Sequence, residues 1–383
     1  MNGKTVTVLQ VGAHGYGRVH LDHQIELAEQ GVVRVVGVAD PRPPDPELIK
    51  RLGRPEVADS PTTLLAKHSP DVVVIATPIH THVPLAVQAM RAGSHVLVEK
   101  PPTATLAEFE ELLSVATETG RSCQIGFQSL GSTALDRARE LIADGSIGEL
   151  RGVGGAGTWI RDAAYYARSA WAGRLVLDGV AVTDGALTNP FAHAVASALR
   201  IVGAEERGSL RSIEVERFRS RAIETDDTAC VRVVTSTGVP VTIAVTLSAA
   251  TSRDPVLTLH GSRGIVRLWY TRDELRLEID GVEQESGSWP RSSLLRNLAE
   301  HVADPSVELL SPATRCHSFM SVLEAIRLDG PAAALSPEHY QMIGEGTAAH
   351  PVVTGVDDAV FASAERLALF SELDLPWGAK RPG

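Results

Sequence analysis

The sequence predicts two α/β units: an amino-terminal doubly wound parallel sheet, then an α+β domain with a predominantly antiparallel sheet. The chain has 383 residues, a length typical of two domains or slightly more. Short apolar runs alternate with helical segments over the first third of the chain, which favours parallel strands linked by helices. Between about residues 209 and 280, apolar and polar residues alternate without intervening helices, which favours antiparallel strands. We therefore expect domains at 1–127 and 128–383.

The first domain is expected to contain five strands and three helices. The strands are predicted over 5–11, 32–39, 71–76, 94–98 and 122–127, and the helices over 18–29, 84–92 and 106–119. The almost continuous valines of 32–39 are typical of a parallel strand buried on both faces. The proline-rich stretch 41–46 cannot continue that strand. Thr105 followed by Glu108 forms a capping-box pattern at the start of helix 106–119.

The second domain is expected to be a sheet with one packed face. In residues 239–247 the odd positions are Val, Ile or Leu, and the even positions are Pro, Thr or Ala. Residues 275–279 alternate in the same way. Such alternation predicts that the opposite face is wetter or covers a partner. The amphipathic segment at about 357–372 is predicted to be a helix that packs back on the body of the protein.

Composition excludes several classes of function. The formal net charge is −11 and no run of Lys or Arg exceeds two residues, which argues against a nucleic-acid groove or an anionic membrane surface as partner. Three widely separated cysteines form neither a disulfide framework nor a metal clip. No apolar stretch of membrane-spanning length and no signal pattern is present, so we expect a cytoplasmic protein.

A glycine-rich turn directly after the first predicted strand favours a dinucleotide-binding Rossmann domain. Gly12 and Gly17 occupy the first and third places of the fingerprint, which serve the tight turn and helix–strand packing. His14 stands where the second glycine belongs, and Gly15 beside it preserves part of that space. The helix that starts near Tyr16 directs its positive end toward a pyrophosphate.

Asp40 at the end of the second strand strengthens this interpretation. It lies about 23 residues beyond the last fingerprint glycine, where a carboxylate accepts hydrogen bonds from an adenosine ribose. The same charge repels a 2′-phosphate, so NAD is favoured over NADP. Arg42 can offset part of that repulsion. We therefore expect NAD as the cofactor.

Four further motifs at strand ends resemble one oxidoreductase family. They are Ala76-Thr77-Pro78, His82, Glu99-Lys100-Pro101 and Gly126-Phe127-Gln128. Together with the glycine turn and the segments 141–148 and 260–264, they are similar to the glucose–fructose oxidoreductase / inositol dehydrogenase (Gfo/Idh/MocA) family. The resemblance covers nearly the whole chain. It implies an oxidoreductase that transfers a hydride between a nicotinamide cofactor and a sugar, cyclitol or related polyhydroxylated substrate.

The resemblance also implies which residues act. Lys100 corresponds to the lysine beside the nicotinamide, where an ammonium polarises the reacting hydroxyl. Glu99 either fixes Lys100 or contacts the nicotinamide ribose. The implied cofactor-side set comprises Ala76, Thr77, Pro78, His82, Glu99, Lys100 and Gln128.

A second family signature, an Asp four residues before a His, is altered here. His193 corresponds to the histidine and is the candidate acid/base, while Asn189 occupies the aspartate position. A spacing of four places both on one face of a helix. An amide cannot hold a negative charge but can hydrogen-bond a substrate hydroxyl. Asp184 is a nearby carboxylate that can compensate, or a turn residue.

The irregular segment from 159 to 171 combines Trp and Tyr with Arg. Aromatic faces and guanidinium groups suit carbohydrates, and Arg161 and Tyr166 are the substrate-side candidates. A packed crossover loop or an oligomer contact is the alternative. The histidines near the glycine turn lack a metal-ligand spacing, so no metal site is expected.

Two alternatives to a dehydrogenase remain open. Some relatives keep the cofactor tightly bound and cleave a glycosidic bond by transient oxidation. A non-catalytic NAD or sugar sensor is the other alternative, because both His14 and Asn189 depart from the expected residue types. A homo-oligomer, dimer or tetramer, is expected through the face of the second sheet.

Overall fold

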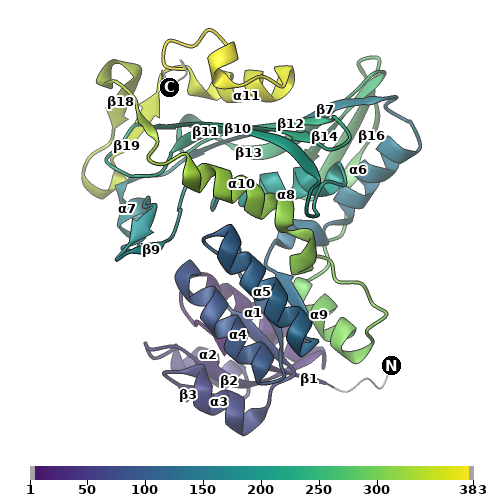
Figure 1. Cartoon of the computed structure of the whole chain (residues 1–383), viewed down its shortest axis with the longest axis vertical. Coiled ribbons are helices and arrows are strands. Elements are labelled where there is room, and N and C mark those ends of the chain that lie inside the picture. The colour runs from purple at the N-terminus through teal and green to yellow at the C-terminus, as the bar shows by residue number, and fades with distance from the viewer. Residues whose placement is uncertain (1–4, 379–383) are drawn as a thin grey trace. The chain divides into compact units, whose positions relative to one another are not determined.

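The computed structural model describes residues 5–378, and these form two compact units (Figure 1). One unit comprises the chain up to Gly131 together with Ser292–Thr314, and the other comprises Ser132–Arg291 together with the chain from Arg315 onward. Each unit has its own sheet and its own helices. The two are therefore described one at a time.

The first unit is built on a six-stranded sheet in which every paired strand is parallel. Its strands are β1 (Val6–Val11), β2 (Val33–Ala39), β3 (Glu56–Ala58), β4 (Val72–Ile75), β5 (His95–Val98) and β6 (Cys123–Ile125). Their order is β3-β2-β1-β4-β5-β6. This is the strand order of a doubly wound dinucleotide-binding fold, and it confirms the predicted fold class.

The helices of this unit follow the expected alternation. They are α1 (Tyr16–Glu29), α2 (Pro46–Arg51), α3 (Pro61–His68), α4 (His82–Arg91), α5 (Leu106–Thr119) and α9 (Leu294–Ala303), with 3₁₀ turns η1 (Ile79–Thr81) and η2 (Gln128–Gly131). The capping box at Thr105 and Glu108 forms as predicted, with the Glu108 amide donating to Thr105 Oγ1 at 3.2 Å.

The sequence analysis missed α2, β3 and α3, which lie between the second and third predicted strands. Pro46 and Pro61 begin the two helices, because proline is favoured in the first turn of a helix. Asp45 and Ser60 cap the two helices by accepting backbone amides.

Residues 292–314 return to the first unit after the second sheet is complete. Leu294, Leu295 and Leu298 of α9 pack in one core cluster with Val8 and Val74. The buried amide of Gln124 donates to the Leu294 carbonyl at 2.6 Å and ties this segment to β6. A single boundary at residue 127, as expected from the sequence, does not describe this return.

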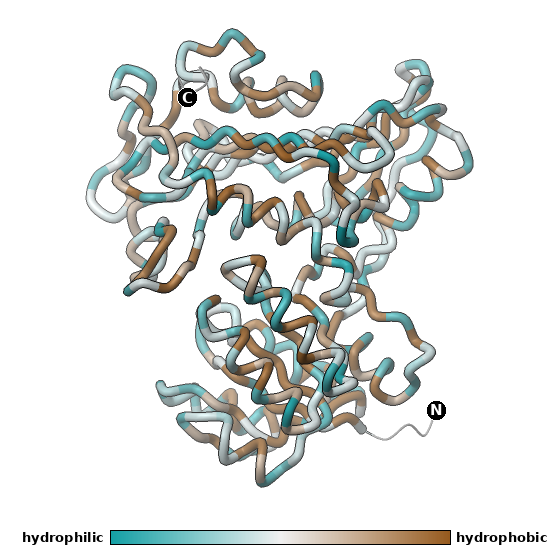
Figure 2. Tube along the Cα trace, in the orientation of Figure 1, coloured by the Kyte–Doolittle hydropathy of each residue, from teal (hydrophilic) through white to brown (hydrophobic). Residues whose placement is uncertain are grey.

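The second unit contains a nine-stranded, mostly antiparallel sheet. Its strands are β7 (Leu150–Ile160), β10 (Leu210–Arg219), β11 (Thr228–Thr235), β12 (Pro240–Thr246), β13 (Ser248–Gly261), β14 (Gly264–Trp269), β15 (Glu274–Ile279), β16 (Val282–Ser288) and β17 (Ala333–Ala334). The order is β16-β15-β14-β13-β7-β12-β11-β10-β17, with parallel pairing only at β7–β12 and β10–β17 among the described residues. Figure 2 shows hydrophobic and hydrophilic segments alternating along these strands.

Helices cover both faces of this sheet (Figure 1). They are α6 (Thr133–Ala143), α8 (Ala192–Ile201), α10 (His317–Leu328) and α11 (Val356–Arg366), while the short helix α7 (Ala163–Ala167) contacts the 3₁₀ turn Gly346–Ala348. Two hairpins complete the unit, β8 (Val176–Leu177) with β9 (Val180–Ala181), and β18 (Tyr340–Ile343) with β19 (His350–Val353). Three 3₁₀ turns of this unit are η4 (Pro337–His339), η5 (Gly346–Ala348) and η6 (Phe370–Glu372), and η3 (Ala313–Arg315) spans the point in the sequence where the chain passes from the first unit to the second.

The prediction of a wetter second face is wrong at the centre of this sheet. Thr242, Ala244 and Thr246 of β12 are all buried. Ala244 belongs to the same core cluster as Val360 of α11, which covers that face. Small side chains on these strands let the helix approach. The alternation in β12 therefore separates a face of small residues from a face of large residues, and both faces are buried.

The carboxyl-terminal helix is shorter than the sequence analysis expected. It ends at Arg366, because Leu367 adopts a left-handed conformation with φ of 53°. The remainder of the expected helix is the 3₁₀ turn Phe370–Glu372. Phe370 and Trp377 then pack edge to face, with ring centroids 5.2 Å apart.

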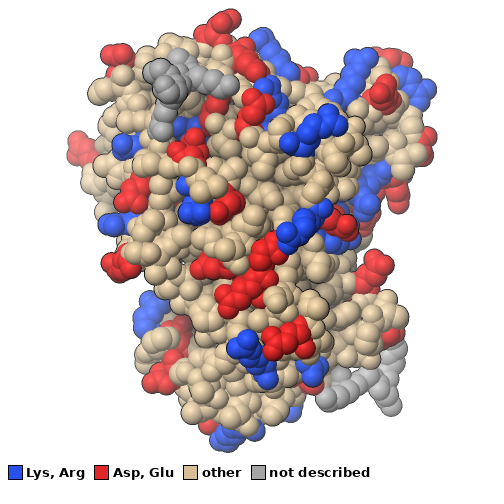
Figure 3. Space-filling model, viewed as in Figure 1, with Lys and Arg blue, Asp and Glu red and all other residues tan. Residues whose placement is uncertain are grey.

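The surface carries mixed charge, and no helix of membrane-spanning character occurs in residues 5–378. On the face of the second unit shown in Figure 3, Lys and Arg lie interspersed with Asp and Glu.

His95, the first residue of β5, accepts a backbone hydrogen bond through its ring. His95 Nδ1 accepts the Ser122 amide at 3.0 Å. Burial, and next the positive charge of Arg121, lower the pKa of His95 from 6.5 to about 4. A proton would remove the acceptor that Ser122 uses.

We expect the free energy of unfolding to decrease as the pH falls from about 6.5 to about 4, because the unfolded chain takes up a proton that native His95 refuses. His95→Asn keeps an acceptor at this position but does not titrate. Urea unfolding measured at several pH values should therefore give a shallower pH slope for the variant than for the native protein. Equal slopes would contradict the assignment.

Candidate active site

The glycine turn lies where the winding of the first sheet changes direction. Strands β1 and β4 are neighbours, and the chain winds outward from them in opposite directions, which opens a ligand crevice at their carboxyl ends. Gly12 has φ of 89°, and a side chain there would collide with the Ala76 carbonyl. A side chain at Gly17 would collide with the Gly12 carbonyl. Both positions therefore require glycine.

Gly15 and Tyr16 open helix α1 toward this crevice. Gly15 has φ of 56° and no atom lies within 4 Å of where its side chain would be. Tyr16 is 49% exposed. His14 lies beside them, with Nε2 3.4 Å from the Arg42 carbonyl oxygen. The open space before a helix amino terminus fits a pyrophosphate.

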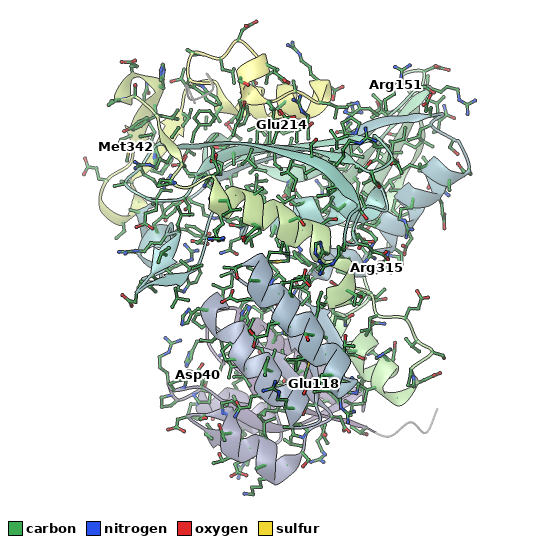
Figure 4. All side chains as sticks on the ribbon, viewed as in Figure 1. Asp40, Glu118, Arg151, Glu214, Arg315 and Met342 are labelled. Atoms are coloured by element: carbon green, nitrogen blue, oxygen red, sulfur yellow. The ribbon has the colours of Figure 1, made fainter. Side chains whose placement is uncertain are left out.

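Asp40 is held firmly at the end of β2 (labelled in Figure 4). Its Oδ2 accepts the Ala13 amide at 2.8 Å, and its Oδ1 accepts the Arg42 amide at 2.8 Å. Each carboxylate oxygen retains a second lone pair, which fits the hydroxyl hydrogens of an adenosine ribose. The Arg42 side chain is 73% exposed, with Nε 3.9 Å from Asp40 Oδ1.

The Ala76-Thr77-Pro78 loop after β4 is tied to the loop after β5 by His82. The His82 ring lies 2.9 Å from the Thr77 carbonyl oxygen through Nε2, and 3.1 Å from that of Pro101 through Nδ1. His82 is only 2% exposed, and burial lowers its pKa. This burial supports a role in holding the two loops rather than in direct cofactor contact.

Glu99 and Lys100 follow β5, and a buried network fixes the glutamate. Glu99 Oε1 lies 2.7 Å from His20 Nε2 and accepts Gln128 Nε2 at 2.8 Å. Glu99 Oε2 accepts the Lys100 amide at 3.1 Å. A side chain at Gly126 would stand 2.6 Å from Glu99 Oε1, so glycine there makes room for the carboxylate.

His20 is a residue whose partner the sequence analysis did not identify. It lies on the buried face of α1 with Gln24, four residues further on, and its ring meets the ring of the exposed Tyr16 edge to face, with centroids 5.5 Å apart. Gln24 donates to the buried Gln10 at 2.6 Å. Polar residues on the inner stripe of a helix were the available signal, but their partners are distant in sequence.

In the second unit, Asp184 and Asn189 contact one another directly. Asn189 Nδ2 donates to Asp184 Oδ1 at 2.7 Å. Asp184 Oδ2 accepts from Arg168 Nη2 at 3.1 Å and from the Gly173 amide at 2.9 Å. The Asp184 side chain is 4% exposed.

The expectation that Asn189 and His193 share a helix is only partly met. Helix α8 begins at Ala192, so Asn189 lies in the turn before it, where Pro190 has no amide hydrogen to donate. His193 lies in the first turn of α8, and every other residue of Ala192–Ile201 is buried. The helix thus leaves one partly exposed side chain, the imidazole.

The buried carboxylate of Asp226 holds the backbone of the segment before α8. Asp226 Oδ2 accepts the Ala186 amide at 2.8 Å, and its Oδ1 lies 3.6 Å from Arg217 Nη1. Burial raises the pKa of Asp226. Phe191 stacks on Trp159 with centroids 4.2 Å apart and fixes the start of α8 against β7.

In the aromatic segment at the end of β7 and after it, arginine guanidinium groups lie against aromatic rings. Arg161 lies 4.9 Å from the Trp159 ring and 5.1 Å from the Tyr165 ring. A hollow of about 490 Å³ adjoins it, lined by Ile160, Arg161, Asp162, Tyr165, Ala348 and His350. Arg161 Nε is buried without a hydrogen-bond partner.

Tyr166 is not among the residues that line this hollow. Its ring lies 4.5 Å from the Arg221 guanidinium, and its hydroxyl is buried without a hydrogen-bond partner. Burial raises the pKa of Tyr166 well above 10.0. The packed-loop alternative accounts for Tyr166, while Arg161 lies where a ligand can reach it.

The predicted site residues thus form two groups. The first unit brings together the glycine turn, Asp40, the loop after β4 and the Glu99–Lys100 pair. The second brings together Asp184 and Asn189, and Arg168, which was not among the predicted site residues, joins them. Within residues 5–378, no three His, Cys, Asp or Glu side chains gather as a metal-binding group. The three cysteines are separate buried thiols.

Two family descriptions match the chain in sequence. Residues 6–127 match the oxidoreductase family with an NAD-binding Rossmann fold, and residues 135–267 match the Gfo/Idh/MocA carboxyl-terminal domain.

Curated relatives match mainly over part of their length. A D-glucoside 3-dehydrogenase of Escherichia coli is 28% identical over 148 residues, 38% of this chain and 42% of the relative. A scyllo-inositol 2-dehydrogenase (NAD⁺) of Bacillus subtilis is 32% identical over 137 residues, 35% of this chain and 40% of the relative. The chain thus spans about two fifths of the length of these relatives.

Solved structures share the fold over most of the chain. The WlbA dehydrogenase of Bordetella pertussis, in complex with NADH and UDP-GlcNAcA, superposes with a TM-score of 0.68 at 21% identity, over 84% of this chain and 95% of that one. The two family descriptions together match more than half of the chain, and they identify it as a member of the Gfo/Idh/MocA oxidoreductase family with an NAD-binding Rossmann domain.

Proposed function

We propose that the protein is an NAD-dependent dehydrogenase that transfers a hydride between a secondary alcohol of a sugar, glycoside or cyclitol and the nicotinamide. The observation that carries the proposal is the Glu99–Lys100 pair. It stands at the ligand-binding edge of an NAD-binding sheet, and buried hydrogen bonds from His20 and Gln128 fix the glutamate. Bound NAD would supply the hydride acceptor.

Lys100 orients and polarises the reacting hydroxyl in this mechanism. Its backbone amide donates to Glu99 Oε2 at 3.1 Å, which sets the direction in which the chain leaves β5. An ammonium beside the substrate oxygen stabilises the alkoxide character that develops as hydride departs.

The second unit supplies the remaining groups. His193 accepts the hydroxyl proton, a role that suits an imidazole near neutral pH. Asn189 binds a neighbouring hydroxyl, and Arg161 contacts a further substrate oxygen from the hollow beside β7. The names of the glucoside and inositol dehydrogenases that this chain resembles support a polyhydroxylated substrate.

A second candidate is cleavage of a glycoside with NAD retained on the protein. A glycosyl hydrolase family 109 protein of Shewanella amazonensis is 34% identical over 133 residues, 31% of this chain and 28% of that protein. Release of an aglycone without net formation of NADH would identify this reaction.

Cellular location and assembly remain predictions. Three buried free thiols support a reducing compartment such as the cytoplasm. We expect a dimer or tetramer, and a measurement of mass in solution tests this expectation.

Replacement of Lys100 by Met should abolish turnover and leave NAD affinity nearly unchanged, because the ammonium acts on the substrate rather than on the dinucleotide. The measurement is formation of NADH by absorbance with a panel of sugars, glycosides and inositols, paired with titration of NAD binding. Lys50→Met, at a lysine 62% exposed on α2, is the matched control and should retain activity.

Full activity of Lys100→Met would refute the proposed role of Lys100. If the native protein binds NAD but forms no NADH with any compound of the panel, the proposed dehydrogenase activity is refuted. Aglycone release would then indicate the hydrolase, and its absence the sensor.

Replacement of Asp40 by Ser should weaken NAD binding about tenfold or more and shift preference toward NADP. The carboxylate accepts ribose hydroxyls and repels a 2′-phosphate, and a hydroxyl does neither as strongly. Dissociation constants for NAD and NADP, measured on both proteins, give the ratio. An unchanged ratio would remove Asp40 from cofactor selection.

A further inference from the structure

The buried contact between Asp184 and Asn189 decides which way the Asn189 amide points. Asn189 Nδ2 lies 2.7 Å from Asp184 Oδ1. An ionised carboxylate only accepts hydrogen bonds, so the nitrogen end of the amide must face it. The amide oxygen, on the opposite side of the same carbon, then faces away from Asp184.

Asp184 is itself fixed on every side. Its second oxygen accepts from Arg168 Nη2 at 3.1 Å and from the Gly173 amide at 2.9 Å. Its backbone carbonyl accepts Thr225 Oγ1 at 2.8 Å. Only 4% of the side chain is exposed, so the carboxylate could rotate toward a ligand only by breaking these hydrogen bonds.

Arg168 is held in turn by aromatic rings. Its guanidinium carbon lies 3.7 Å from the centroid of Tyr165 and 4.7 Å from that of Trp171. A guanidinium between two rings keeps its charge next to the carboxylate at little cost in side-chain entropy. The segment around α7 therefore holds the acid that orients the amide.

We propose that Asp184 is a positioning residue, which locks Asn189 so that its amide oxygen faces the substrate. The inference rests on the proposed function, in which Asn189 binds a substrate hydroxyl. A locked acceptor selects a hydroxyl that donates a hydrogen bond at this position. Polyols that carry a methyl ether there, or lack the oxygen, are then poor substrates.

Exchange of the two side chains tests this assignment. The side chain at position 184 accepts hydrogen bonds from three donors, which are the Asn189 amide nitrogen, Arg168 Nη2 and the Gly173 backbone amide. In Asp184→Asn, the nitrogen of the new amide must face one of these donors. The hydrogen bond to position 189 is kept in that case only if the Asn189 amide turns over and presents its oxygen. In the double variant Asp184→Asn/Asn189→Asp, an amide at 184 donates to a carboxylate at 189, whose other oxygen again faces outward as an acceptor. Asn189→Asp alone sets two carboxylates against each other.

The first readout is thermal unfolding of these variants, which needs no substrate. Both single variants should unfold at lower temperature than the native protein. The double variant should recover part of the loss, because the hydrogen bond between positions 184 and 189 is restored. Asp178→Asn, the same chemical change in the exposed turn between β8 and β9, is the matched control and should unfold like the native protein.

The second readout is KM for the best polyol of the panel and for its O-methyl analogue at each hydroxyl. Asp184→Asn should raise KM for the polyol about tenfold with a smaller change in kcat. The difference in KM between the polyol and one of its O-methyl analogues should become smaller than in the native protein. The double variant should restore both. A purely structural role of Asp184 would lower stability without a change in this discrimination.

The outcomes separate the two proposals. A double variant no more stable than the worse single variant overturns the orientation of Asn189, whatever the activity. Restored stability with unaltered discrimination overturns the substrate contact. Absence of polyol turnover in the native protein refutes the proposed function, and the unfolding temperatures still decide the Asp184–Asn189 contact.

Discussion

The arrangement of the second unit depends on the four glycines of strand β7. Strand β7 lies at the centre of its sheet, and its glycines admit neighbours on both faces. A side chain at Gly154 would collide with the Ala364 backbone of α11, and one at Gly157 would collide with the Phe191 ring. Phe191 stacks on Trp159 and precedes α8. Larger residues in place of these glycines would displace α8, so the glycines of β7 determine the position of His193 on that helix.

Each group of site residues uses one buried carboxylate to orient a neighbour. Glu99 is held by His20 and directs the chain at Lys100, and Asp184 is held by Arg168 and directs Asn189. Buried charges are costly to desolvate, and such pairs contribute more to a defined geometry than to net stability. Rigid orientation of polar groups is what catalysis requires, because donors and acceptors must be aimed before the reaction begins.

Local features were predictable from sequence, and features that join distant segments were not. Helix 106–119 and its capping box depend on residues within one turn of each other, and both formed as expected. The His20–Glu99 contact joins residues 79 positions apart, and periodicity carries no information about such partners. Asn189 and His193 were expected on one helix, but the helix begins only at Ala192, after Pro190. Burial of both faces of β12 was missed because the covering helix lies more than 100 residues downstream.

The return of residues 292–314 to the first unit has a consequence for synthesis on the ribosome. When residue 131 has been made, all six strands of the first sheet exist, but the apolar surface that Leu294, Leu295 and Leu298 cover is still open. Strands β7 to β16 are translated before that surface can close. The nascent chain must therefore carry an incomplete core through the period when the second sheet emerges, which favours aggregation and chaperone capture. Division of the gene after residue 131 would make that transient exposure permanent.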